Sequence, residues 1–304
     1  MAGGLGLLAG RQALAEGRAG AVTGPAPDRS RWNARDPALR KAAQLGQSAL
    51  EARDVAEEEK LLTQLIGQFD GAQYRGREWY GDILGRAYGD RGNARARQGK
   101  LEAALGDYDA SIERAPWATD PVLNKGVALE AMGNFPGAIE CYEEVLEANP
   151  SDPAGWNNLG NAKLGMGDWS GAARGYDEAA RLAPQFSFSR CNYAIALYQG
   201  AEDDAAVKKT LQSLTRKYPN FDDPHAALTA ILWDAGERDK AEDEWLRVED
   251  PRYGDIAWLV KERRWPDRPT PASAQRGSVA GLRVFVEASD REALLRTTAL
   301  SVTR

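Results

Sequence analysis

The chain of 304 residues is poor in residues that bind metals or form cross-links. It has one histidine, His225, and two cysteines, Cys141 and Cys191. These three residues are too few and too far apart for a zinc motif or a disulfide framework. We therefore predict no structural metal and no cofactor.

Long apolar runs and an excess of basic residues are also absent. No run reaches the roughly 18 apolar residues of a membrane-spanning helix, so no transmembrane segment is expected. The 39 basic and 45 acidic residues give a net charge of -6, which argues against a nucleic-acid partner because phosphate backbones bind basic faces. Apolar residues still make up 43% of the chain, enough for a large core in one long domain or two ordinary ones.

Residue patterns that are typical of an active site are missing as well. His225 follows Pro224 at a predicted helix start, where capping or solvent exposure is its ordinary role, and nucleophilic catalysis needs a base beside the nucleophile. No glycine-rich phosphate loop follows a strand, and the acidic pairs at 203–204 and 222–223 suit helix starts. We predict that the protein is not an enzyme.

Residues 1–36 differ in composition from the rest of the chain. The apolar run GGLGLLAG precedes the small-x-small pattern of residues 13–15 that signal peptidases accept, but no basic segment comes before it. Two interpretations stay open, a targeting signal that has lost its basic start and a flexible end. The Gly-, Pro- and Arg-rich stretch that follows indicates a tether.

A repeat with a period of 34 residues occupies the middle of the chain. Each copy has a small residue on a first helix, a turn glycine, an alanine and a tyrosine on a second helix, and a closing proline. The small residues are Gly92, Gly126 and Gly160, and the turn glycines are Gly99, Gly133 and Gly167. The second helices carry Ala104, Ala138 and Ala172, then Tyr108, Tyr142 and Tyr176, and the closing prolines are Pro116, Pro150 and Pro184.

This pattern predicts pairs of closely packed antiparallel helices. The small residue and the alanine let the two backbones approach, and the tyrosine is expected to fill the space against the next pair. The turn glycine supplies a positive φ, and the proline ends the second helix. One hairpin cannot bury its apolar face, so neighbouring pairs must stack.

The period and these residues resemble the tetratricopeptide repeat. The resemblance implies an all-α fold, a right-handed superhelical solenoid of about five to six helix pairs. We expect the solenoid over residues 74–253, with repeats near residues 85–118, 119–152, 153–186, 187–221 and 222–253. The last two are weaker and keep Ala194, Ala206 and Ala241, with Thr229 at one small site.

The residues on either side of the solenoid are expected to complete it. Residues 37–73 place apolar residues three or four apart and predict a degenerate helical hairpin. Residues 254–304 are interpreted as a cap and tail that can contain a further helix, with Trp258 and Trp265 covering the last repeat. The basic residues around Trp265 leave peripheral contact with an anionic membrane or an acidic partner open. They are Lys261, Arg263, Arg264 and Arg268.

The first helix of each pair is expected to line a concave groove. Two residues before the small site stand Asn124, Asn158 and Asn192, and one residue after it stand Asn93 and Asn161. Amides both donate and accept hydrogen bonds, so such a ladder can bind the backbone of an extended peptide. Asparagine is also common at these places in the tetratricopeptide repeat, where it bonds neighbouring helices, and both interpretations stay open.

A second series of groove residues is predicted four residues after each small site. It runs Ala96, Glu130, Leu164, Tyr198, Trp233 and becomes apolar and aromatic toward its end. Exposed aromatic side chains in a concave surface are typical anchors for a partner. We therefore expect Leu164, Tyr198 and Trp233 to be either docking residues or residues covered by the C-terminal segment.

Chaperone-binding tetratricopeptide domains hold a C-terminal carboxylate with a clamp of Lys, Asn, Asn, Lys and Arg. The matching residues here are Gly89, Asn93, Asn124, Ala154 and Asn158, so all three cations are missing. The comparison excludes this mode of binding. Cys141 and Cys191 fall on repeats two apart, too distant for a disulfide, so we predict free thiols, with that of Cys191 open to exposure on a groove helix.

Four stretches, in forms that the repeat alone does not require, resemble a narrower tetratricopeptide family of cyanobacteria and chloroplasts. They are GRAYGDRGNARARQGKLEAAL, PWATDPVLNKGVALEAMGNF, APQFSFSRCNYAIALYQ and DPRYGDIAWLVKERRWP. The plant members are described as chloroplast lumen proteins. The resemblance implies the thylakoid lumen rather than the stroma, with GGLGLLAGRQALA as the tail of a transfer signal, and the stroma stays the alternative.

Two functional hypotheses follow. The first is a non-catalytic scaffold that binds a protein or peptide in its concave groove, in the assembly or maintenance of photosynthetic membrane complexes. The second is a self-associating structural protein whose groove is filled by its own C-terminal segment or by a second copy. Neither the partner nor the oligomeric state follows from the sequence.

Overall fold

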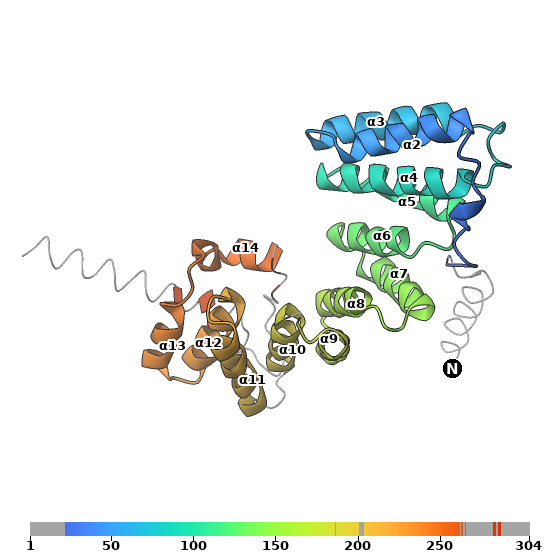
Figure 1. Ribbon diagram of the computed structural model, residues 1–304. Coiled ribbons are helices and arrows are strands. Elements are labelled where there is room, and N and C mark those ends of the chain that lie inside the picture. Colours follow the sequence, from blue (N-terminus) through green and yellow to red (C-terminus); the bar gives the residue numbers. More distant parts are fainter. Residues whose placement is uncertain are drawn as a thin grey trace, which may run out of the picture. The chain divides into compact units, whose positions relative to one another are not determined.

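The computed structural model describes residues 22–185, 187–200, 204–261, 263, 265, 282–283 and 285–286 (Figure 1). These residues form helices and turns, and no strand occurs among them. The chain divides into two compact units, residues 1–151 and residues 152–304, and each is described by itself. The predicted signal remnant, Arg264, Arg268 and most of the predicted C-terminal tail lie outside the described residues.

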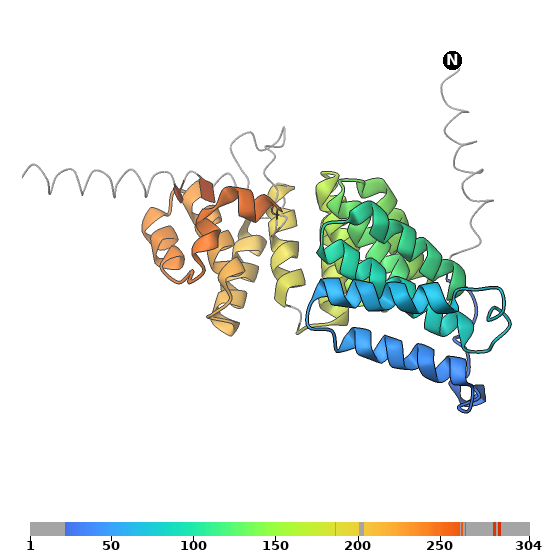
Figure 2. The same ribbon diagram turned by 90° about the horizontal axis from the view of Figure 1, so that it is seen from above.

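Unit 1 contains three consecutive helix pairs. They are α2 (Pro37–Leu50) with α3 (Val55–Phe69), α4 (Tyr80–Arg97) with α5 (Leu101–Arg114), and α6 (Asp120–Ala131) with α7 (Phe135–Ala148), preceded by the short η1 (Arg29–Arg31). Asp36 and Asp54 cap α2 and α3 by accepting hydrogen bonds from the first backbone N–H groups. Figures 1 and 2 show the α2–α3 pair stacked on α4 and α5.

Unit 2 continues the succession of pairs and ends in a cap. The pairs are α8 (Pro153–Gly165) with α9 (Trp169–Leu182), α10 (Ser187–Gln199) with α11 (Asp204–Lys217), and α12 (Asp222–Asp234) with α13 (Arg238–Trp245). The cap contains η2 (Pro251–Gly254) and α14 (Ile256–Lys261). Its core joins the last two pairs to residues of the cap, including Leu259, Trp265 and Phe285.

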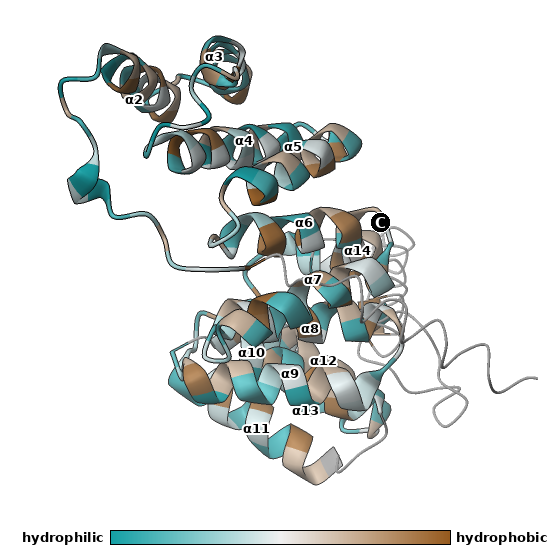
Figure 3. Cartoon of the chain, turned by 90° about the vertical axis from the view of Figure 1, so that its right-hand side faces the viewer, coloured by the Kyte–Doolittle hydropathy of each residue, from teal (hydrophilic) through white to brown (hydrophobic). Residues whose placement is uncertain are grey.

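The helices of unit 1 are amphipathic and are held together by their apolar faces. In Figure 3, α2 to α5 each carry hydrophilic and hydrophobic residues around the helix, as expected where one face is buried. The first pair buries Leu62, Leu65 and Phe69 against Trp79 and Leu84 at the start of the next pair. Among the described residues, no helix is both long and apolar enough to cross a membrane.

The 34-residue pattern marks close contacts between the two helices of each repeat. A Cβ atom on Gly92, Gly126 or Gly160 would lie 2.7, 2.6 or 2.8 Å from the tyrosine ring of the same repeat. The three rings, of Tyr108, Tyr142 and Tyr176, are almost fully buried. The prediction that each tyrosine packs against the next pair was incomplete, because the ring also lies on the glycine of its own pair.

The turns between paired helices follow the prediction except in the fourth repeat. Gly99, Gly133 and Gly167 have φ values of 75°, 78° and 78°, which confirms the predicted left-handed turns. Between α10 and α11 four residues intervene, whereas three separate α8 from α9. The extra residue shifts the register, so the expected core residue Ala206 is exposed and Val207 is buried in its place.

Candidate binding groove

Unit 1 contains a groove of about 900 Å³ between α4, the start of α6 and the extended segment that precedes η1. Two of the predicted groove residues, Asn93 and Asn124, line it. The other lining residues are Ala26, Pro27, Asp28, Arg29, Leu50, Asp82, Gly85, Arg86, Gly89, Asp90, Ser111, Ala115, Trp117, Ala118, Asp120 and Pro121.

One stripe of α4 forms the main wall of the groove. Asp82, Arg86, Asp90 and Asn93 are three or four residues apart, so their side chains share one face of the helix. Gly85 and Gly89 lie in the same stripe and face α5, where a Cβ atom would lie 2.5 Å from Ala115 and 3.3 Å from Ser111, so they allow α5 to approach α4 closely. This stripe was not predicted as a unit, although all of it except Asp82 lies within the first expected repeat, residues 85–118, and its three- and four-residue spacing is visible in the sequence.

The second wall is a segment that we call the strap, residues 22–29. Val22 packs with Val122 and Val145, and the Thr23 backbone N–H donates a hydrogen bond to the Pro116 carbonyl. At the other end, the Arg29 guanidinium lies 3.1 Å from the Asp82 carboxylate. Figure 1 shows the strap, in dark blue, running past the ends of α6 and α4 before the chain enters α2. The strap is therefore fixed at both ends.

The groove carries more negative than positive charge. Its acidic residues are Asp28, Asp82, Asp90 and Asp120, and its basic residues are Arg29 and Arg86. Both arginines contact the same carboxylate, because Arg86 lies 3.4 Å from Asp82. The Asp90 carboxylate makes no hydrogen bond or ion pair with any described residue. Burial raises its pKa, nearby Glu58 raises the pKa further, and Arg97 partly offsets both.

Three asparagines of the predicted ladder, Asn93, Asn124 and Asn161, form hydrogen bonds between helices, as the alternative interpretation expects. The Asn93 side-chain oxygen accepts hydrogen bonds from the Tyr108 hydroxyl and the Asn124 amide, each at 3.0 Å. In unit 2, Asn161 accepts from Tyr176 at 2.8 Å. The Asn93 amide nitrogen and the Asn124 amide oxygen are not used in these bonds, so both residues can also face a ligand.

The remaining predicted groove residues belong to unit 2. Asn158 and Asn192 are half-buried, and neither side chain forms a hydrogen bond with another described residue. Leu164 and Tyr198 are 8% and 3% exposed, and the half-buried Trp233 packs edge-on against Phe285 at 5.2 Å between ring centroids. Of the two interpretations left open, that of exposed docking anchors is therefore wrong for Leu164 and Tyr198, and the contact of Trp233 with Phe285 agrees with the other one, cover by the C-terminal segment.

Helix geometry explains this error. A residue four positions after the small site lies on the same helix face as that site, and this face packs against the second helix. Leu164 accordingly shares a cluster with Ala172 and Tyr176. In the second repeat the equivalent Glu130 is buried and accepts a hydrogen bond from Tyr142 at 2.9 Å.

In unit 2, residues of the cap cover the starts of α10 and α12. Arg263 Nε lies 2.9 Å from the Asp223 carboxylate, and its guanidinium stacks 5.2 Å from the ring centroid of Phe188. Trp265 is 2% exposed and Trp258 packs on Tyr253 at 5.3 Å, which confirms that both tryptophans cap the last repeat.

The cysteines and the histidine are structural. Cys141 and Cys191 are free and buried, so the expected exposure of Cys191 was wrong, because the cap residues pack over it. Burial raises the pKa of the Cys141 thiol to about 11 and that of Cys191 as well, which makes both unreactive. His225 is also buried rather than exposed, and its ring nitrogens contact Glu244 at 2.6 Å and the Pro219 carbonyl at 3.1 Å.

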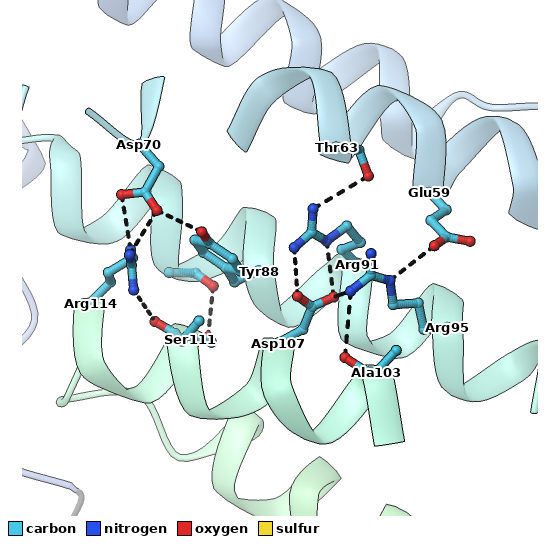
Figure 4. Close-up of polar contacts among 12 residues, drawn as sticks. Glu59, Thr63, Asp70, Tyr88, Arg91, Arg95, Ala103, Asp107, Ser111 and Arg114 are labelled. Carbon is cyan, nitrogen blue, oxygen red and sulfur yellow. Dashed lines mark hydrogen bonds and ion pairs between the residues drawn. The ribbon is translucent and has the colours of Figure 1, made fainter. Parts of the chain in front are cut away.

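A polar network on the far side of α4 fixes the helix that forms the groove wall (Figure 4). Asp107 accepts hydrogen bonds from Arg91 at 2.6 and 2.9 Å and from Arg95 at 2.9 Å, and Arg95 also contacts Glu59 on α3. At about 100° per residue, these arginines are rotated by about 100° to 180° around α4 from Asp82 and Asp90, away from the groove.

The second half of the network is centred on Asp70. Tyr80, Tyr88 and Arg114 all donate hydrogen bonds to its carboxylate, the last at 2.7 Å. Burial alone would raise the pKa of Asp70, but these three donors outweigh it and lower the pKa. Burial and the bond to Asp70 raise the pKa of Tyr88 to about 12. The network joins α3, α4 and α5. None of these residues lines the groove, but the network shares the helix α4 with the groove wall.

Comparison with known proteins identifies the repeats. The family model described as tetratricopeptide repeat matches residues 123–185 and, in an overlapping second match, residues 157–220. Residues 123–220 are tetratricopeptide repeats. The Gly–Tyr contacts described above are thus the packing of this repeat, and no curated relative matches the chain.

Solved structures agree with this fold. A tetratricopeptide repeat protein from Parabacteroides merdae is 15% identical, with a TM-score of 0.59 over 84% of this chain and 88% of that chain. MamA from Desulfovibrio magneticus is 16% identical, with a TM-score of 0.51 over 60% of this chain and 96% of that chain. YrrB, a tetratricopeptide protein with an unusual peptide-binding site, is 16% identical, with a TM-score of 0.48 over 66% and 97%. At these identities, the first two structures show a shared fold alone.

Proposed function

We propose that this protein is a non-catalytic scaffold that binds an extended polypeptide segment in the groove of unit 1. The observation that carries the proposal is the open groove of about 900 Å³, with the amides of Asn93 and Asn124 on its wall. The lining includes no histidine, cysteine or lysine, and its single hydroxyl, that of Ser111, is buried and donates to the Gly85 carbonyl at 2.7 Å. The lining therefore favours recognition over chemistry.

The groove suits an extended chain because its polar groups are already fixed. Amides can pair with both N–H and C=O groups of a peptide backbone without selecting its side chains. The walls are held by the strap and by the network on the far face of α4, so the scaffold loses little conformational freedom when a ligand binds. Affinity would come from several weak contacts along a preformed surface.

The second hypothesis, a groove filled by the chain's own C-terminal segment, has support in unit 2. There Arg263 contacts both Asp223 and Phe188 at the starts of α12 and α10. In unit 1 the strap is the segment outside the helix pairs that lines the groove among the described residues, and it lines one side. We therefore place partner binding in unit 1 and self-covering in unit 2.

We further propose that the protein acts in the thylakoid lumen, in the assembly or maintenance of photosynthetic membrane complexes. The support is the sequence resemblance to the cyanobacterial and chloroplast family. Protease protection in isolated thylakoids tests the location, since a lumenal protein is degraded only after the membrane is opened. Degradation in intact thylakoids would contradict it.

Photo-crosslinking tests the groove directly. Benzoylphenylalanine in place of Ala118 puts a reactive group in the groove, and the same residue in place of the exposed Glu143 on α7 is the matched control. We expect Ala118→benzoylphenylalanine to yield a crosslink to a partner polypeptide that the control does not yield. Equal crosslinking from both positions, or crosslinking only to a second copy, would contradict the proposal.

A further inference from the structure

We infer that the groove of unit 1 selects a basic ligand, an extended segment of another protein whose lysine or arginine side chain pairs with Asp90. The inference rests on the proposed function, because it names the chemistry of the polypeptide that the groove binds. It goes beyond that function because it assigns a positive charge to the partner and names Asp90 as the residue that recognises this charge.

The charges of the groove are the first argument. Both groove arginines are engaged with Asp82, at 3.1 and 3.4 Å, so neither neutralises the rest of the site. Asp90 and Asp120 have no ion-pair partner among the described residues. A half-buried carboxylate without a counter-ion is unfavourable, and a cation brought by a ligand would remove that cost.

The chain itself shows how such carboxylates are satisfied. On the same face of α4, Asp82 is paired with Arg29, which arrives on the extended strap. In unit 2, the buried Asp223 near the start of α12 is paired with Arg263 of the cap. In both cases a segment outside the helix pair supplies an arginine that forms an ion pair with a carboxylate near the start of the pair's first helix. Asp90 is the groove carboxylate for which no described segment does so.

The position of Asp90 also suits a long basic side chain. Asp90 lies eight residues beyond Asp82 on α4, about 12 Å further along the helix, so the two carboxylates are separate subsites. The Leu50 side chain, which is 74% exposed, lines the same groove and offers an apolar surface for the methylene stem of a lysine or arginine. Nearby Arg97 does not compete for Asp90, because it is paired with Glu58 at 2.6 Å.

Peptides of different charge test the inference on the full-length protein. The probes are a nine-residue peptide of alternating arginine and serine, the same peptide with glutamine for arginine, and the same with glutamate. Each carries a fluorophore for anisotropy titration. We expect the arginine peptide to bind at least tenfold more tightly than the glutamine peptide, and the glutamate peptide not to bind.

A pair of variants distinguishes binding at Asp90 from general attraction to the net charge of -6. Asp90→Asn and the control Glu143→Gln remove the same charge, the first inside the groove and the second on an exposed part of α7. Loss of a charged hydrogen-bond partner is expected to weaken the arginine peptide about tenfold in Asp90→Asn, with no change in Glu143→Gln. Thermal melting of both variants verifies that they are folded.

The outcomes distinguish the inference from the proposed function beneath it. If the arginine and glutamine peptides bind equally and Ala118→Trp blocks both, the basic ligand is overturned and the polypeptide groove stands. Equal loss in the two charge variants would show attraction to the whole protein and would also overturn it. If no peptide of any charge binds and Ala118→benzoylphenylalanine gives no crosslink, the proposed function fails as well.

Discussion

The two units contain the same kind of helix pair. They differ in how far other segments of the chain cover the N-terminal ends of the first helices of these pairs. In unit 2 the cap lays Arg263 and Trp265 over α10 and α12, and the buried Asp223 is neutralised from within the chain. In unit 1 the strap reaches Asp82 but not Asp90, and an open groove of about 900 Å³ remains. In both units the repeat determines how the helices pack. The segments outside the repeat, the strap in unit 1 and the cap in unit 2, determine which surface stays open.

The two carboxylates make the same point in electrostatic terms. Burial raises the pKa of Asp223, and the ion pair with Arg263 offsets part of that effect. Burial also raises the pKa of Asp90, but there Arg97, the cation that offsets part of this effect, is engaged by Glu58. One carboxylate is a completed structural contact and the other is a site that a ligand can complete.

The largest effect is expected from breaking the completed contact. Arg263→Ala leaves the Asp223 carboxylate, 3% exposed, without its cation, and this should lower the free energy of unfolding of unit 2 by about 3 kcal/mol. Urea unfolding followed by tryptophan fluorescence measures the loss. Asp223→Asn added to Arg263→Ala should recover part of it. A loss below about 0.5 kcal/mol, as for an ordinary surface substitution, would mean that the cap does not depend on this pair.

The repeat packing should respond alike in both units. Gly126→Ala in unit 1 and Gly160→Ala in unit 2 each place a methyl group less than 3 Å from a buried tyrosine ring. Overpacking of this kind is expected to cost about 1 to 3 kcal/mol in each unit, measured by urea unfolding. A large cost in one unit and none in the other would show that the units differ in their packing as well as in their added segments.

A smaller and pH-dependent effect is expected from Asp90→Asn. Because the folded protein raises the pKa of Asp90, the carboxylate costs no stability below its unfolded pKa of 3.8, and the cost is complete above the raised folded pKa. Asp90→Asn should therefore be more stable than the native protein at pH 7, and its advantage should shrink toward pH 4. A difference in the free energy of unfolding that is equal at the two pH values would contradict this account.

The smallest effect is expected at the contact between α3 and α4. Hydrogen bonds from Lys100 and Arg95 lower the pKa of Glu59 to about 2, so its contribution to stability is present above pH 4.5 and disappears as the pH falls toward 2. The free energy of unfolding of Glu59→Gln should be a few tenths of a kcal/mol lower than that of the native protein at pH 7. It should also fall less steeply than that of the native protein as the pH is lowered from 4.5 toward 2. If the variant and the native protein unfold identically in acid, Glu59 does not contribute to stability as proposed.

The fold could be predicted because its determinants are local and periodic. The glycine, alanine and tyrosine of each 34-residue period set the spacing of two helices, and the turn glycines adopt the φ values that the pattern requires. The predicted register failed only at Ala206, where one extra residue separates α10 from α11. The sequence carries a sign of this shift, because Pro219 follows Pro184 by 35 residues instead of 34.

The groove could be predicted only in part because most of its residues are brought together over long distances. Asn93 and Asn124 were found from their place in the repeat, and both line the groove. The strap was interpreted as a tether, since nothing local shows that Arg29 meets Asp82, 53 residues later. The series ending in Trp233 was misplaced because helical periodicity puts it on the buried face with the small residues.

The most direct test compares the two units with one probe. Benzoylphenylalanine replaces Ala118 in the groove of unit 1 or Phe188 beside Arg263 in unit 2, and each protein is irradiated with the arginine–serine peptide. The account predicts a crosslink to the peptide from position 118, and from position 188 only crosslinks within the chain to residues of the cap. Capture of the peptide from position 188 and not from position 118 would contradict it.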